Sequence, residues 1–176
     1  MKLTLFLLLG YPGAGKSTLS KQLVKHYGFV WVNTDEIRPY MYDNTEDIRN
    51  PQNNPAVFGA IDYATEKLLS AGLSVLYDAN NNKLFYRVAV ERLAAKYDAE
   101  TVIIWVRTPL ESSRERNDNR APDAGYGRIP EERYNQLVRN LQEPTADEHV
   151  IEIDGLSEPD EQVRSFGEAA RRLGII

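Results

Sequence analysis

Short apolar runs alternate along the chain with longer amphipathic stretches. The apolar runs cover residues 3–9, 29–32, 74–77, 101–106 and 150–153. Runs of this length, bounded by turn residues, predict strands that are buried on both faces of a sheet. Apolar positions spaced by three and four predict helices over residues 16–27, 57–70, 85–96, 110–119, 131–141 and 160–173.

The alternation of strand and helix predicts the fold class. Repeated strand–helix–strand units build parallel sheets with helices on both faces. Gly28 and Gly72 each stand between a predicted helix and the next strand, where a glycine can end the helix. We therefore predict one α/β domain over residues 1–176, with a parallel five-stranded sheet.

Two polar stretches interrupt this pattern. Residues 43–55 read DNTEDIRNPQNNP and predict a loop, because Asn, Asp and Pro favour turns. Residues 119–130 read NRAPDAGYGRIP, which fits either a surface connection or a lid that closes over a substrate. In the second interpretation a small lid covers roughly residues 114–140.

Composition narrows the possible chemistry. Of the 176 residues, 21 are Lys or Arg and 26 are Asp or Glu, which gives a net charge of −5, and there is no cysteine. Disulfides, thiolate zinc sites and cysteine nucleophiles are therefore excluded. The acidic balance argues against a protein that coats nucleic acid, although it permits a local basic groove. No apolar run approaches the roughly 18 residues of a membrane span, and we expect a cytoplasmic protein.

The strongest motif lies between the first predicted strand and the first helix. The sequence GYPGAGKST at residues 10–18 satisfies the pattern GxxxxGK[ST] in the context that this pattern requires. Glycines allow backbone N–H groups to converge on phosphate oxygens, and the helix N-terminus adds its positive end. The motif predicts phosphate binding by Gly10, Gly13, Ala14, Gly15, Lys16, Ser17 and Thr18. Lys16 would reach the β and γ phosphates of ATP, and Ser17 would hold Mg²⁺.

Carboxylates follow the second and third strands. The ends of parallel strands line the ligand crevice, so Asp35 and Asp78 should lie near the phosphates. Asp35 would take the proton of an attacking hydroxyl, and Arg38 lies about one helical turn further on. The alternative interpretation is that Asp35 only caps a helix and that Arg38 is solvated. Asp78 would order the Mg²⁺ through water, or serve only as a cap or turn residue.

Arginines gather on the predicted helix 110–119 and at its exit. Arg116 and Arg120 share one helical face and would clamp the transferred phosphate, whereas Arg114 fits a solvated position. Arg128, Arg133 and Arg139 would extend a basic strip toward a polyanionic substrate. The alternative is an arginine-rich surface without a ligand.

These motifs together resemble a known family. The P-loop, the segments NTDEIR (33–38) and DANN (78–81), and RNDNR (116–120) followed by IPEERYNQL are similar to P-loop kinases of the polynucleotide-kinase and zeta-toxin-like group. Within it the closest likeness is to the 5′-hydroxyl polynucleotide kinase domain. One departure is DANN, where the group commonly has DATN.

The resemblance implies a P-loop NTPase fold of the nucleoside-kinase type with a small lid. It also implies that Asp35 is the general base, that Arg38 contacts an acceptor-side phosphate, and that Arg120 binds the transferred phosphate from the lid.

The expected activity is Mg²⁺-dependent transfer of the γ-phosphoryl group of ATP to a hydroxyl acceptor. The acceptor is either a small molecule or the 5′ end of a nucleic acid. The expected catalytic residues are Lys16, Asp35, Arg38 and Arg120, while Arg116 and Arg120 join the P-loop in binding the nucleotide and Ser17 and Asp78 hold the metal. A nucleotide-binding module or sensor without an acceptor is the alternative.

Overall fold

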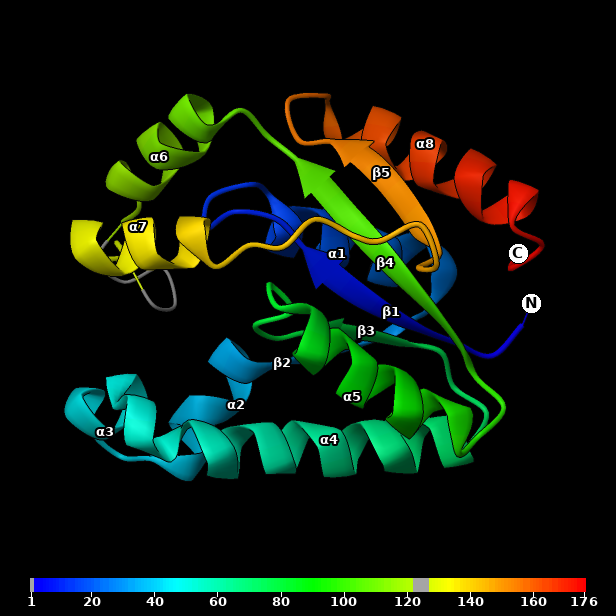
Figure 1. The fold of residues 1–176 in the computed structure, drawn as a ribbon, viewed down its shortest axis with the longest axis horizontal. Helices are drawn as coiled ribbons and strands as arrows, with labels where there is room; N and C mark the ends of the chain where they lie inside the picture. The colour runs from blue at the N-terminus through cyan, green and yellow to red at the C-terminus, as the bar shows by residue number, and fades with distance from the viewer. Residues whose placement is uncertain (1, 122–126) are drawn as a thin grey trace.

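A parallel sheet of five strands forms the centre of the protein (Figure 1). The structure, a computed structural model, describes residues 2–121 and 127–176. Its strands are β1 (Thr4–Leu9), β2 (Val30–Asn33), β3 (Val75–Asp78), β4 (Glu100–Arg107) and β5 (Val150–Asp154). They lie side by side in the order β2-β3-β1-β4-β5, and every pairing is parallel. The predicted α/β fold with a five-stranded parallel sheet is therefore confirmed.

Helices cover both faces of the sheet. Helices α1 (Lys16–Tyr27) and α8 (Pro159–Arg172) pack on one face, and α4 (Asn54–Ser70) and α5 (Leu84–Ala95) pack on the other (Figure 1). In the central strand β1, Phe6 and Leu8 point into the core beneath α1 and α8, whereas Leu5, Leu7 and Leu9 point into the second core. Burial on both faces explains why β1 is a continuous apolar run.

The segment 43–55 is more ordered than the predicted loop. It contains the short helix α3 (Thr45–Arg49), a 3₁₀ turn η1 (Pro51–Asn53) and the start of α4. The side chain of Asn44 accepts a hydrogen bond from the Asp47 N–H at 2.8 Å, and Asn50 caps the following turn in the same way. The asparagines that favoured a loop prediction thus act as helix caps, which corrects that prediction.

Helix α2 (Thr34–Met41) begins directly at the end of β2. Its cap is Asn33, whose Oδ1 accepts a hydrogen bond from the Asp35 N–H at 2.6 Å. Asp35 therefore lies in the first turn and is not itself the cap, so its carboxylate is left for other contacts. Arg38 follows one turn later on the same helix.

The predicted lid region contains α6 (Leu110–Asp118) and α7 (Glu131–Arg139). The Asn117 side chain holds α6 to the segment that precedes α7. It accepts a hydrogen bond from the Ile129 N–H at 3.1 Å and donates one to the Ile129 carbonyl at 3.0 Å. Residues 122–126 of this region lie outside the described residues, and closure of a lid stays a prediction. Within the described ranges, no helix combines the length and the apolar character needed to cross a membrane.

Candidate functional site

The P-loop between β1 and α1 is held in shape by side chains from elements that follow β4. Thr108 Oγ1 donates to the Ala14 carbonyl at 2.8 Å, and Ser113 Oγ donates to the Pro12 carbonyl at 2.6 Å. The Tyr134 hydroxyl of α7 donates in turn to Ser113 Oγ at 3.0 Å. These bonds occupy carbonyl oxygens of the loop. The Ala14 N–H donates to the Tyr11 carbonyl at 3.0 Å, and the N–H groups at the start of α1 can converge on an anion.

Gly13 is required by a close approach of two backbones. Its φ is +86°, and a Cβ atom there would collide with the Ser113 carbonyl oxygen of α6. A side chain would therefore separate the P-loop from α6, the helix that carries Arg116.

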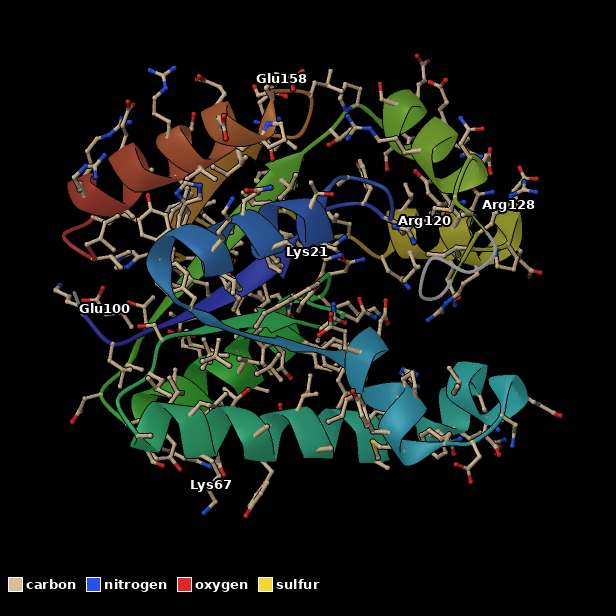
Figure 2. The ribbon with its side chains drawn as sticks, turned by 180° about the vertical axis from the view of Figure 1, so that it is seen from behind. Lys21, Lys67, Glu100, Arg120, Arg128 and Glu158 are labelled. Atoms are coloured by element: carbon tan, nitrogen blue, oxygen red, sulfur yellow. The ribbon has the colours of Figure 1, made fainter. Side chains whose placement is uncertain are left out.

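A cavity of about 450 Å³ opens above the P-loop. One wall is formed by predicted phosphate-binding residues and the other by the loop between β5 and α8. Its lining comprises Gly13, Gly15, Lys16, Ser17, Thr18, Arg116, Arg120, Gly155, Leu156, Ser157, Glu158, Pro159 and Gln162. Figure 2 shows Arg120 beside the first turn of α1 and Glu158 at the start of α8. The structure thus brings the two predicted arginines together with the P-loop, whereas Gly10 and Ala14 are not part of this lining.

The Lys16 side chain folds back onto the P-loop. Its ammonium donates to the Gly10 carbonyl at 2.9 Å and to the Tyr11 carbonyl at 3.0 Å. Burial lowers the pKa of Lys16, and the negative charges of Asp78 and Asp35 partly oppose this shift. The Lys16 ammonium therefore lies where it can move from the loop carbonyls to a bound phosphate.

Asp35 lies among three cations at the carboxyl edge of the sheet. Its carboxylate interacts electrostatically with Arg38, Lys16 and Arg120, which come from α2, α1 and the exit of α6. Asp35 is exposed at the surface, yet the protein around its carboxylate partly desolvates it, and this desolvation raises the pKa of Asp35 despite the three cations. A carboxylate of raised pKa next to a phosphate site is suited to accept a proton.

Asp78 is buried at the end of β3. Its Oδ2 atom accepts from Asn33 Nδ2 at 3.0 Å and from Trp31 Nε1 at 3.3 Å, and both donors come from β2. Burial raises the pKa of Asp78 to about 6, while Lys16 lowers it and Asp35 raises it further. Asp78 does not cap the next helix, because the cap position of α5 belongs to Lys83.

The groups at this edge fit Mg²⁺. Ser17 supplies a hydroxyl in the cavity wall, Asp78 supplies a carboxylate, and oxygen is the donor that Mg²⁺ prefers. In the described part of the chain, no group of three or more His, Cys, Asp or Glu residues is placed to hold a metal alone. The ion would therefore take most of its ligands from water and from nucleotide phosphates, as Mg²⁺ commonly does.

Arg38 is directed toward the segment that follows its own helix. It is 6% exposed, and its guanidinium donates to the Ile48 carbonyl at 3.3 Å and to Asn54 Oδ1. It lies beside Asp35 but does not line the 450 Å³ cavity. Its predicted contact with an acceptor phosphate stays a prediction.

The remaining lid arginines pair with neighbours. Arg114 donates to Asn135 Oδ1 of α7 at 2.9 Å, and Arg128 forms an ion pair with Asp118 at 3.0 Å. Arg133 donates to a glutamine of its own helix. Arg114 is therefore held against α7 and is not the solvated side chain that the sequence predicted, and Asp118 offsets the charge of Arg128 in the predicted basic strip.

The β5–α8 loop is the part of the site that sequence reasoning missed. Its residues 155–159 line the cavity, Arg116 Nη1 donates to the Gly155 carbonyl at 2.9 Å, and Gln162 Nε2 donates to the Asp154 carbonyl at 2.9 Å. The signal was available: this loop also follows the carboxyl end of a parallel strand, which is where ligands bind in such sheets.

We expect Gly155→Ala to destabilise the protein and to weaken nucleotide binding. A Cβ there would collide with Thr108 Oγ1 and lie 2.7 Å from the Ala14 carbonyl oxygen, so the loop must move away from the P-loop. Such overpacking costs about 1–3 kcal/mol of unfolding free energy. Gly59→Ala is the matched control: nothing lies within 4 Å of a Cβ in the middle of α4, and the change should stabilise by about 0.5–1 kcal/mol. Denaturant unfolding and ADP titration of both variants check this; equal stability of the two would contradict it.

In the metal-free protein, we also expect the free energy of unfolding to depend on pH through Asp78. The substitution Asp78→Asn should remove this dependence. The pKa of Asp78 is about 6 in the folded state and 3.8 in the unfolded state, so the folded state binds more protons between these values. The free energy of unfolding therefore falls as pH rises from about 4 to 6, by at most about 3 kcal/mol.

The asparagine keeps an oxygen acceptor for Asn33 and Trp31 and carries no charge to desolvate. In urea unfolding from pH 4 to 7, the stability of the variant relative to wild type should increase with pH. A pH-independent difference would contradict the burial of an ionising carboxylate. Glu36→Gln, which removes an exposed carboxylate of α2, is the control.

The sheet order, the flanking helices and the P-loop together define the class of the protein as a P-loop NTPase with the fold of P-loop kinases. The chain belongs to the AAA domain family, whose profile matches residues 5–144.

Individual relatives carry kinase names. The chain is 31% identical over 119 residues to a cytidylate kinase of Methanocella arvoryzae, a match that covers 64% of this chain and 61% of that protein. A gluconokinase from Sinorhizobium meliloti 1021 has a similar fold, with a TM-score of 0.71 and 16% identity over 98% of this chain and 95% of that one.

The likeness to polynucleotide kinases is narrower. A chain of the Pnkp1/Rnl/Hen1 complex matches with a TM-score of 0.58 and 23% identity, over 65% of this chain and 39% of its own length. The broad expectation of a P-loop kinase family is confirmed, and for the finer likeness to the 5′-hydroxyl kinase domain this structure gives a partial match.

Proposed function

We propose that the protein is a kinase that transfers the γ-phosphoryl group of ATP, with Mg²⁺, to a hydroxyl group of a small molecule. The observation that carries this proposal is the position of Asp35, which interacts with Arg38 and with two cations that line the P-loop cavity, Lys16 and Arg120. A nucleotide sensor needs the P-loop alone. A carboxylate that can accept a proton, placed among cations that can neutralise a transferring phosphoryl group, is what transfer to a hydroxyl requires.

Two features favour a small acceptor over a polynucleotide. The lid arginines Arg114 and Arg128 form ion pairs with Glu131 at 3.6 Å and with Asp118 at 3.0 Å, which leaves less free positive charge for a chain of phosphates. The relatives with kinase names, a cytidylate kinase and a gluconokinase, are named after small substrates.

The proposed mechanism assigns each step to a residue of this chain. Lys16 leaves the Gly10 and Tyr11 carbonyls and neutralises the β and γ phosphates, while Arg120 neutralises charge on the transferred group. Asp35 accepts the proton of the acceptor hydroxyl while the oxygen of that hydroxyl bonds to the γ phosphorus. The bond from that phosphorus to the β–γ bridging oxygen breaks, and ADP leaves.

Ser17 and Asp78 would hold Mg²⁺, directly or through water, and the ion would supply charge neutralisation between the β and γ phosphates. The hydrogen bonds from Asn33 and Trp31 hold the buried Asp78 carboxylate in one orientation.

The test measures ADP release with three acceptor classes, supplied separately: nucleosides, sugar acids and 5′-hydroxyl oligonucleotides. We expect a small acceptor to raise the rate of ADP release well above the rate with ATP alone. A rise with oligonucleotides only would replace this proposal by a polynucleotide kinase. No rise with any class, together with tight ATP binding, would favour the nucleotide sensor.

A further inference from the structure

The side chain of Asn33 connects the backbone N–H of Asp35 with the carboxylate of Asp78. Asn33 is the last residue of β2 and pairs in register with Asp78, the last residue of β3. Asn33 Oδ1 accepts from the Asp35 N–H at 2.6 Å, and Asn33 Nδ2 donates to Asp78 Oδ2 at 3.0 Å. One amide group thus contacts the first turn of α2 and the buried carboxylate of β3.

Only one orientation of the amide satisfies both contacts. A flipped amide would set its NH₂ group against the Asp35 N–H and its oxygen against the Asp78 carboxylate. Both contacts would then be repulsive, and Asn33 is itself 8% exposed, so water cannot easily replace them. An asparagine meets this requirement because it carries a donor and an acceptor on one planar group.

We propose that Asn33 is a positioning residue, which fixes the first turn of α2, and with it the backbone of Asp35, relative to the Asp78 carboxylate. The inference rests on the proposed function, in which Asp35 takes the acceptor proton and Asp78 serves the Mg²⁺ position. Trp31, whose Nε1 donates to the same Oδ2 atom at 3.3 Å, completes the support of Asp78 from β2.

The substitution Asn33→Asp separates the two contacts. A carboxylate oxygen still accepts from the Asp35 N–H, so the cap of α2 is kept. Its other oxygen replaces a donor and faces Asp78 Oδ2, so the second contact becomes repulsive. Asn33→Ser also keeps a capping oxygen, and it removes the donor without adding charge.

The matched control is Asn44→Asp. Asn44 caps α3 through the Asp47 N–H at 2.8 Å, and its Nδ2 donates to a carboxylate, Asp47 Oδ2, at 2.7 Å. It therefore makes the same two kinds of contact on an exposed helix outside the P-loop cavity.

We expect kcat to fall about 10- to 100-fold in Asn33→Asp and by less in Asn33→Ser, with the KM for ATP changed less than about threefold. Asn44→Asp should keep kcat within about twofold. Equal losses of kcat in the two aspartate variants, or a wild-type kcat in Asn33→Asp, would overturn the inference.

A second measurement needs neither acceptor nor metal. The indole ¹H–¹⁵N resonance of Trp31 in the nucleotide-free protein reports on the Asp78 carboxylate, and Trp105→Phe assigns it. We expect this resonance to move in Asn33→Asp and Asn33→Ser and to stay in place in Asn44→Asp. A resonance that stays in place in both Asn33 variants would overturn the inference, whether or not the wild-type protein transfers phosphate. A wild-type protein that transfers no phosphate would contradict only the proposed function.

Discussion

Lys16→Ala is expected to reduce phosphoryl transfer at least ~10³-fold and to weaken ATP binding. Lys16 is the P-loop cation, and it interacts electrostatically with both Asp78 and Asp35. In the variant, the negative charges of these two carboxylates and of the nucleotide phosphates are no longer neutralised by the P-loop lysine. Calorimetric titration of ATP and measurement of kcat check the two effects separately.

Lys21→Ala is the control for Lys16→Ala, because Lys21 is an exposed lysine of the same helix (Figure 2). It should leave both ATP affinity and kcat close to the wild-type values. ATP binding and turnover of Lys16→Ala at wild-type levels would contradict the assignment of this loop as the phosphate site.

Asp35→Asn is expected to reduce kcat at least ~10²-fold while ATP binds nearly as in wild type. The amide keeps the size of the carboxylate and loses the ability to accept the acceptor proton. Because the cap of α2 uses the Asp35 backbone N–H and not its side chain, the helix should stay in place. The raised pKa of Asp35 adds a second expectation: wild-type turnover should decrease as pH falls, with a midpoint above the ordinary value of an aspartate.

Glu36→Gln removes the neighbouring carboxylate of α2 and serves as the control, with kcat expected to stay close to wild type. If Asp35→Asn turned over at the wild-type rate, Asp35 would have to be removed from the mechanism.

The fold was predictable because its signals are local. A strand that is buried on both faces must be apolar along its length, and β1 meets this condition at every position. Helix α1 was predicted with its observed bounds, since Gly15 precedes it and Gly28 ends it. The segment 43–55 was predicted wrongly because Asn and Pro favour both turns and helix starts, and only packing against α2 and α4 decides between them.

The site was predictable where residues are close in sequence or follow strand ends. Lys16, Ser17, Arg116 and Arg120 were expected to share one ligand, and they line one cavity. The role of Arg38 was less accessible, because its contacts with Ile48 and Asn54 depend on how α3 and α4 fold back over α2. The Asn33 bridge required the register of β2 on β3, which no single segment of the sequence contains.

The central claim is that this cleft transfers a phosphoryl group to an acceptor. The most direct measurement incubates the protein with Mg²⁺, γ-³²P-labelled ATP and a mixture of small hydroxyl compounds, and then separates phosphate esters from inorganic phosphate. The account predicts an acid-stable labelled ester that disappears in Asp35→Asn and persists in Glu36→Gln. Label found only in ATP and inorganic phosphate, with every acceptor class present, would contradict it.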